Sequence, residues 1–229
     1  MVMCDTIKPP SYGAAIVRIH GTKKSLAMTT DCNSNYCKHD PFIGTIHAVS
    51  EARRNIISTG AIPLAITNNL NFGNPEDKNI MGQFVMSVKG MIDSCKKYFL
   101  PVISGNVSFY NETNKIGISP TPVIGMIGLI KNTNSSNKKN LLKENDQIFL
   151  IGKKINNISC SSFLERIILK NNKNLGPPPS INYNEEIKNG NFVLNLFKNN
   201  LIKYCNDVSS GGTIISLLKM LINKQFGVE

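Results

Sequence analysis

The stretch VISGNVSFY at residues 102–110, together with ITNNLNFGNP at residues 66–75, decides the fold of this chain. Each begins as an apolar run that predicts a buried β-strand, and each runs into a cluster of Gly, Asn and Ser. Gly105 lets backbone N–H groups approach an anion with no side chain in the way. Asn106 and Ser108 alternate along an extended chain, so both point to one face. Because amide oxygens suit Mg²⁺ and a hydroxyl can hold a substrate oxygen, these strand ends predict a site for phosphate and metal.

Strand and helix patterns alternate on the N-terminal side of these segments. Short apolar runs at about 14–20 and 25–30, separated by GTKK, predict two strands joined in a hairpin. Apolar residues then recur at helical spacing over 42–59, and Gly60 follows as a cap. The apolar run IPLAIT predicts the next strand, which leads into the first of the two polar clusters.

A long helix and two more strands are expected further along the chain. Pro75 is expected to open a helix that continues to about Tyr98. Helical spacing gives this helix an apolar stripe that we expect to be buried, made of Met81, Phe84, Val85, Val88, Met91, Ile92 and Cys95. The polar segment NETNKIG predicts a turn, and TPVIGMIGLI at 121–130 predicts a final strand.

This order of elements predicts an α/β fold, built as layers of sheet and helix with the helices on one face. We expect a first domain over 1–131, because the polar stretch 132–140 lacks periodicity and is typical of a linker. A second α/β domain over 141–229 is expected to begin with the strand QIFLIG and to continue with three helices, at about 161–170, 184–200 and 213–223. The sequence stops at FGVE, where such a domain would add strands, so this second domain is expected to be incomplete.

The composition is that of an ordinary soluble protein, with 41% hydrophobic and 18% charged residues. No apolar run approaches the roughly 20 residues of a membrane span, and the N-terminus lacks the apolar core of a signal peptide, so we expect a cytoplasmic protein without membrane contact. The net charge of +11 comes from lysines scattered among asparagines, without interleaved aromatic residues. This pattern does not favour specific nucleic-acid binding, which would show a steep salt dependence.

The cysteines are expected to be reduced. Six of them are spread over a chain that is too large to need disulfide bonds for stability. Cys32, Cys37 and His39 raise the question of a zinc site. However, the two cysteines are far apart for a zinc knuckle and no second Cys pair follows closely, so structural or incidental thiols are favoured.

Several motifs, in order, carry a resemblance to a known family. TTDCNSNYCKHDP, ITNNLNFGNPEDKNIMGQF, PVISGNVSFYNETNKIGISPTPVIGMIGLI and NDVSSGG cover nearly the whole chain. Together they resemble the second half of phosphoribosylformylglycinamidine synthase, a ligase of purine biosynthesis. The resemblance implies an N-terminal domain like that of aminoimidazole ribonucleotide synthetase, followed by an incomplete C-terminal domain of the same superfamily.

The resemblance also implies roles for four residues. Asn68 and Gly105 would contact ATP, Asn106 would ligate Mg²⁺, and Ser108 would touch the ribonucleotide substrate. Asn68 departs from the family pattern, which usually has aspartate there. The loop NDVSSGG departs as well, because Asn206 and Ser210 stand where the family usually has histidine and aspartate. The loop can form an anion cradle at a helix N-terminus, or Ser209 or Ser210 can simply cap that helix.

As to activity, the resemblance implies ATP-dependent conversion of formylglycinamide ribonucleotide to its amidine, with ammonia from a glutaminase subunit and with a small accessory subunit in the complex. The family's catalytic histidines lie in the first half, so no catalytic residue is expected in this chain, and we expect it to be inactive alone. The alternative is a noncatalytic nucleotide-binding or scaffolding module. An apolar sheet face is expected to pair with the missing N-terminal half or with a second copy.

Overall fold

The computed structural model describes residues 13–135, 142–153, 157–169, 175–222, 224–225 and 227. Its centre is a five-stranded sheet with the order β1-β2-β7-β3-β4. These strands are β1 (Ala15–Arg18), β2 (Ser25–Asp31), β7 (Thr121–Ile130), β3 (Ile62–Asn71) and β4 (Val102–Ser108). All neighbours are antiparallel except β3 and β4, which are parallel. The predicted hairpin at the N-terminus and the predicted final strand are both confirmed.

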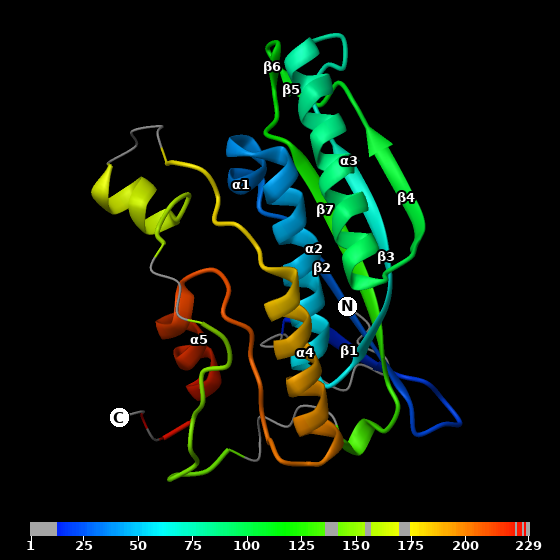
Figure 1. Ribbon diagram of the computed structural model, residues 1–229, viewed down its shortest axis with the longest axis vertical. Helices are drawn as coiled ribbons and strands as arrows, with labels where there is room; N and C mark the ends of the chain where they lie inside the picture. Colours follow the sequence, from blue (N-terminus) through cyan, green and yellow to red (C-terminus); the bar gives the residue numbers. More distant parts are fainter. Residues whose placement is uncertain are drawn as a thin grey trace.

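Helices α2 (Pro41–Ser58) and α3 (Lys78–Tyr98) lie side by side over one face of the sheet (Figure 1). Their close approach depends on small residues, since a Cβ at Gly90 would stand only 2.4 Å from the carbonyl oxygen of Phe42. The predicted helix cap is also found: Thr59 ends α2 and Gly60 follows with φ +86°. The mixed α/β fold with helices on one face is therefore as expected.

The start and the buried face of α3 differ from the prediction. Asp77 caps the helix by accepting a hydrogen bond from Asn79 N at 2.7 Å, so the helix begins at Lys78 and not at Pro75. The buried face consists of Ser87, Gly90, Met91, Ser94, Cys95 and Tyr98. Met81, Val85 and Ile92 from the predicted stripe are exposed, because the helix turns its small residues toward α2.

Strand β4 is exposed, contrary to the prediction of a buried strand. It is an edge strand of the sheet, and Val102, Ile103 and Val107 are 47%, 67% and 47% exposed. The strand also ends at Ser108, before the predicted Tyr110. Beyond it, β5 (Glu112–Thr113) and β6 (Ile116–Gly117) form a small hairpin where a turn was predicted.

A short helix that the sequence analysis did not predict, α1 (Ser34–His39), precedes α2. Asn33 caps its start by accepting from Tyr36 N at 3.1 Å. Asp40 ends α1 and at the same time caps α2, by accepting from Ile43 N at 2.9 Å. The side-chain caps of Asn33 and Asp40 thus define the starts of α1 and α2 in a segment whose polar sequence is typical of a loop.

The C-terminal part contains the three predicted helical segments. They are α4 (Tyr183–Lys198), α5 (Gly212–Leu221) and a turn of π-helix, η3 (Leu164–Ile168). Helix α4 packs against α2 (Figure 1). Between the two helices, Ile57 of α2 forms a buried cluster with Val193 and Phe197 of α4. The predicted strand at 147–152 is wrong: these residues have no regular secondary structure and form no ladder, and Phe149 is 76% exposed. A strand needs a hydrogen-bonding neighbour, and the described residues offer none at this position.

The first part of the predicted linker contains a short 3-10 turn, η1 (Thr133–Ser135). The rest of the linker, residues 136–140, lies outside the described residues. Within the described part of the chain, no helix combines the length and the apolar character that a membrane span needs.

Candidate functional site

The parallel pairing of β3 and β4 brings the two polar clusters of the sequence together. Asn68 pairs with Gly105, Asn69 with Asn106, and Asn71 with Ser108. All four residues expected to bind ATP, metal or substrate therefore lie on neighbouring strands. Because both strands run in the same direction, their polar C-terminal ends meet at one edge of the sheet.

The four residues lie on two opposite faces of the sheet, Asn68 and Gly105 on one face and Asn106 and Ser108 on the other. Ile66 and Leu70 are buried under the helices, and Asn68 lies between them on the same face of β3. Asn68 reaches over Gly105, since a Cβ at residue 105 would be 2.6 Å from Asn68 Oδ1. Asn106 and Ser108 point to the opposite, open face of the sheet. A ligand that touches both pairs must pass around β4, which is the edge strand next to β3.

The open face carries a wider set of polar residues than the sequence analysis singled out. We call this set the polar ladder: Thr67, Asn69 and Asn71 of β3, with Ser104, Asn106 and Ser108 of β4. Hydrogen bonds join its rungs, with 2.6 Å between the hydroxyl oxygens of Thr67 and Ser104 and 3.0 Å from Asn106 Nδ2 to Asn69 Oδ1. Alternation of polar residues in TNNLN and SGNVS is the sequence signal for the full ladder.

Asn111 fixes the end of the polar ladder, and the sequence analysis missed it. Its Nδ2 donates to the carbonyl oxygens of Phe72 and Ser108, both at 3.0 Å, and lies 3.1 Å from Ser108 Oγ. The hydroxyl of Ser108 in turn donates to Asn111 Oδ1 at 3.3 Å. One side chain therefore ties the end of β3 to the end of β4 and orients the predicted substrate-binding hydroxyl.

The residues around Asn106 fit a magnesium ion only in part. Asn106 is exposed and can present an amide oxygen, which is a suitable ligand for Mg²⁺. Its neighbours in the polar ladder are neutral amides and hydroxyls. In the described ranges, no group of three or more His, Cys, Asp or Glu side chains could hold a metal ion. Phosphate oxygens and water would have to supply most of the coordination and charge, as Mg²⁺ commonly allows.

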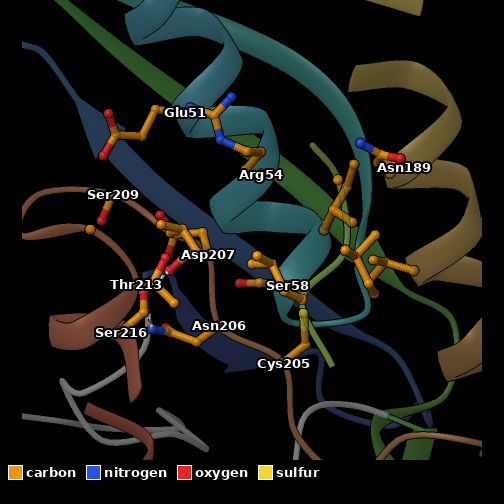
Figure 2. Close-up of a pocket in the computed structure, with 18 of the residues that line it drawn as sticks. Glu51, Arg54, Ser58, Asn189, Cys205, Asn206, Asp207, Ser209, Thr213 and Ser216 are labelled. Carbon is orange, nitrogen blue, oxygen red and sulfur yellow. Dashed lines mark hydrogen bonds between the residues drawn. The ribbon is translucent and has the colours of Figure 1, made fainter. Parts of the chain in front are cut away.

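A second feature is a broad cleft between α2 and the C-terminal part, with charged and polar side chains on its walls (Figure 2). Glu51 and Arg54 of α2 line one side, and Asp207 and Ser209 of the loop before α5 lie across from them. Arg54 Nη1 donates to Glu186 Oε1 of α4 at 2.8 Å, which links α2 to α4.

Burial changes the acid groups beside this cleft. Desolvation raises the pKa of Glu51, and the negative charges of Asp31 and Asp207 raise it further. Desolvation likewise raises the pKa of Asp31, although Asn55 Nδ2 donates to both of its carboxylate oxygens at 3.2 and 3.1 Å. Asp207 Oδ2 is buried and has no hydrogen-bond partner among the residues that the structure describes. Glu51 and Asp207, which line the cleft, and Asp31 beside it are therefore poorly solvated.

The loop NDVSSGG forms a tight turn into α5, but neither Ser209 nor Ser210 caps that helix through its side chain. The cap residue is Gly211, with φ +90°, and Gly212 N donates to the backbone oxygen of Ser209 at 2.9 Å. Asn206 is used structurally, because its Nδ2 donates to Ser216 Oγ at 3.3 Å. The serine-cap interpretation is thus wrong, whereas the anion cradle at this helix end stays a prediction.

The histidines lie away from the polar ladder. His47 Nε2 is 2.6 Å from the carbonyl oxygen of Pro179, and burial lowers the pKa of this imidazole. His20 is in the β1–β2 turn, and His39 ends α1.

Comparison with known proteins gives the same picture as the fold. The family model described as AIR synthase related protein, N-terminal domain, matches residues 12–130. Phosphoribosylformylglycinamidine synthase subunit PurL of Azorhizobium caulinodans is 41% identical over 229 residues, which are 100% of this chain and 31% of that protein. PurL of Pelagibacter ubique is 45% identical over 226 residues, 99% of this chain and 30% of that protein.

Solved structures agree. Thermotoga maritima PurL complexed with ATP has a TM-score of 0.55 at 35% identity, over 58% of this chain and 22% of that chain. The structure of PurLQS from the same organism gives 0.56 at 36% identity, over 60% and 23%. The chain thus spans about a third of the curated relatives it matches. Because the family model covers more than half of its residues, the chain belongs to the AIR synthase related family, in which it is similar to PurL over its whole length.

Proposed function

We propose that this chain supplies one side of the ATP site of a cytoplasmic phosphoribosylformylglycinamidine synthase. In this proposal Asn68 and Gly105 contact ATP, Asn106 provides an oxygen to Mg²⁺, and Ser108 contacts formylglycinamide ribonucleotide. The complete enzyme would join ammonia from a glutaminase subunit to the activated substrate, with a small accessory subunit in the assembly. Residues 1–131 and 141–229 would be its two domains here.

The observation that carries the proposal is the register of β3 and β4. It brings four residues with these expected roles within two neighbouring strands, in a chain that is 41% identical to a PurL subunit over all 229 residues. Thermotoga maritima PurL, which is 35–36% identical to this chain over the matched part, forms complexes with ATP and with FGAR, and this supports the same pair of ligands for this chain.

The site is open on one side, and this supports a dependence on further protein. The polar ladder faces away from α2 and α3, and Thr67, Asn69, Ser104 and Asn106 on it are exposed. Phosphoryl transfer depends on positioned charge around the phosphates. Neutral amides on one face do not provide it, so the chain on its own should not turn over substrate.

Two measurements test the proposal. Isothermal titration should detect ATP binding to the full chain in the presence of Mg²⁺, and Asn106→Ala and Ser108→Ala should each weaken the binding of their own ligand, Mg-ATP and the ribonucleotide respectively. An assay with ammonia, Mg-ATP and formylglycinamide ribonucleotide should show no amidine formation. Turnover by the chain alone would contradict the proposal that it holds only one side of the site. Failure of the wild-type chain to bind either ligand would contradict the assignment of the site residues.

A noncatalytic module is the second candidate, and the neutral Asn68 favours it. The loss of a carboxylate beside Gly105 removes charge that a bound Mg-ATP would use. If the chain acts only as a scaffold, ATP binding should be absent or independent of Mg²⁺, and the Asn106→Ala variant should behave as the wild type does.

The open sheet face supports pairing with a second sheet. Apolar side chains cover its part nearest β1, β2 and β7, with Met28 39% and Ile62 40% exposed and Val17, Leu26, Ile127 and Leu129 half-buried. We propose that a second copy, or the other half of the synthase, covers this area and leaves the polar ladder between the two sheets. Sedimentation at micromolar concentration should show a dimer of the isolated chain, and Met28→Lys should dissociate it. A wild-type chain that sediments as a monomer would contradict pairing between copies.

A further inference from the structure

Asn111 lies directly behind the hydroxyl of Ser108, at the point where β4 ends. Its Nδ2 donates to Ser108 Oγ at 3.1 Å and to the carbonyl oxygens of Phe72 and Ser108, both at 3.0 Å. The Ser108 hydroxyl donates to Asn111 Oδ1 at 3.3 Å. Both residues are half-buried, so the pair is supported by protein and still accessible to a ligand. The proposed function gives a role to Ser108 and none to Asn111.

The two carbonyl oxygens determine which end of the Asn111 amide faces the strand ends. Carbonyl oxygens accept hydrogen bonds and cannot donate them, so Nδ2 must point at Phe72 O and Ser108 O. The reverse orientation would place Oδ1 against two acceptors. Because three protein oxygens already share the two hydrogens of Nδ2, a hydrogen bond donated to a ligand must come from the Ser108 hydroxyl.

The hydroxyl of Ser108 can turn to a ligand at little cost. Hydrogen bonds between two oxygens are usually 2.7–2.8 Å long, so the 3.3 Å bond to Asn111 Oδ1 is weak. The bond from Asn111 Nδ2 to Ser108 Oγ, at 3.1 Å, does not depend on where the hydroxyl hydrogen points. A hydroxyl that accepts one hydrogen bond becomes a stronger donor in another. Asn111 therefore prepares Ser108 to donate.

The backbone around the pair is fixed. Phe72 N donates to Ser108 O at 3.0 Å, Asn111 N donates to Phe72 O at 3.1 Å, and Tyr110 N donates to Gly73 O at 3.0 Å. Tyr110 has φ +58°, in the left-handed region that a bulky residue seldom adopts. Such strain persists only where the surrounding structure imposes it, and it is common at ligand sites. The pair is thus held in place before a ligand arrives.

We infer that Asn111 is a positioning residue that makes Ser108 a hydrogen-bond donor to an acceptor oxygen of the ribonucleotide, in its phosphate or its amide group. Asn111 Nδ2 donates to Ser108 Oγ, and the hydroxyl hydrogen leaves Asn111 Oδ1 for the ligand oxygen. The inference rests on the proposed function, in which Ser108 contacts this substrate. It adds the direction of the hydrogen bond and the residue that sets it.

A double-mutant cycle tests whether Asn111 acts through Ser108. Isothermal titration of the full chain with formylglycinamide ribonucleotide gives the dissociation constants. Ser108→Ala should raise the constant about tenfold and Asn111→Ala about fivefold. The double variant should bind no more weakly than Ser108→Ala, because Asn111 would then have no hydroxyl to position. Independent losses that multiply to about 50-fold in the double variant would overturn the inference.

Asn111→Asp tests the direction of the hydrogen bond. A carboxylate at residue 111 holds the hydroxyl hydrogen of Ser108 more strongly than an amide oxygen does, so it keeps that hydrogen from the ligand. Asn111→Asp should therefore bind the ribonucleotide more weakly than Asn111→Ala. Binding as tight as that of the wild type would mean that Ser108 accepts from the ligand, and the inference would be wrong.

Mg-ATP provides the control for a distorted strand end. Asn68 and Gly105 lie on the same two strands, so a general displacement would weaken the binding of both ligands. Asn111→Ala should keep the Mg-ATP affinity of the wild type, and Asn191→Ala, on the exposed side of α4, should change neither affinity. Equal losses for both ligands in Asn111→Ala would show a purely structural role. If Asn111→Ala does not fold, Asn111→Ser, which keeps one donor, replaces it in the cycle.

Ribose 5-phosphate separates the two sources of the acceptor oxygen. If the oxygen belongs to the phosphate, Ser108→Ala and Asn111→Ala should both weaken the binding of ribose 5-phosphate. If it belongs to the amide group, only the complete ribonucleotide should bind more weakly. A wild-type chain that does not bind the ribonucleotide, or normal binding by Ser108→Ala, would contradict the proposed function itself. Weak binding by Ser108→Ala beside normal binding by Asn111→Ala would contradict this inference alone.

Discussion

The amide of Asn68 lies over the backbone of Gly105, so close that a Cβ at residue 105 would stand 2.6 Å from Asn68 Oδ1. Gly105→Ala must therefore displace the Asn68 side chain. We expect a coupling of about 1 kcal/mol in the free energy of unfolding, with the alanine costing more beside Asn68 than in an Asn68→Ala background. Urea unfolding of the two single variants and the double variant measures it. Equal costs in both backgrounds would show that the contact is not tight.

Asn111 makes the second contact on which the strand ends depend. Asn111→Ala removes donors from the carbonyl oxygens of Phe72 and Ser108, and we expect unfolding to become easier by about 1–3 kcal/mol. Asn191→Ala is the matched control, because Asn191 is exposed on α4 and alanine favours helix. Urea midpoints should fall for the first variant only. Similar midpoints for both would mean that water replaces the hydrogen bonds of Asn111.

Asp31 makes stability depend on pH in a defined direction. Burial raises the pKa of its carboxyl group above the value of an ordinary aspartate, so over the pH range between the two values the folded state holds a proton that the unfolded state has lost. The contribution of this group to stability is therefore complete below its unfolded pKa and is lost as the pH rises through its folded pKa. Relative to Asp31→Asn, wild-type stability should rise when the pH falls from 7 to 4. Urea unfolding of both proteins across this range provides the measurement, and a wild-type protein that becomes more stable relative to Asp31→Asn as the pH rises would contradict the burial of this charge.

The sequence predicts most of the sheet because its strands are continuous apolar runs between clear turn residues. TPVIGMIGLI becomes β7, with Ile124 and Met126 buried, and the hairpin GTKK joins β1 to β2. The burial of β4 could not be predicted from its apolar residues. Exposure depends on strand order, and an apolar run does not show that its strand lies at the edge.

The errors on α3 and on residues 147–152 also have physical causes. Helical spacing of large apolar residues predicted a stripe through Val85 and Ile92, but α2 and α3 meet at small residues, which carry little hydrophobic signal. The run QIFLIG is apolar enough for a strand and lacks a neighbour to pair with in the described chain. The polar ladder could be read in part, since alternation gives the face of Asn106 and Ser108 but not their pairing with Asn69 and Asn71.

Asn68→Asp tests the proposed nucleotide site by restoring the carboxylate that the family resemblance implies. Without Mg²⁺ the new charge should repel the triphosphate and weaken ATP binding. With Mg²⁺ it should help to hold the metal, and we expect ATP affinity to increase about tenfold, or about 1.4 kcal/mol. Asn191→Asp on α4 makes the same charge change at a remote, exposed site and should alter neither value. Titration calorimetry measures the ATP affinity of each variant and of the wild type, with and without Mg²⁺. If both variants behave alike, Asn68 does not face the nucleotide, and the assignment of ATP to the Asn68 and Gly105 pair fails.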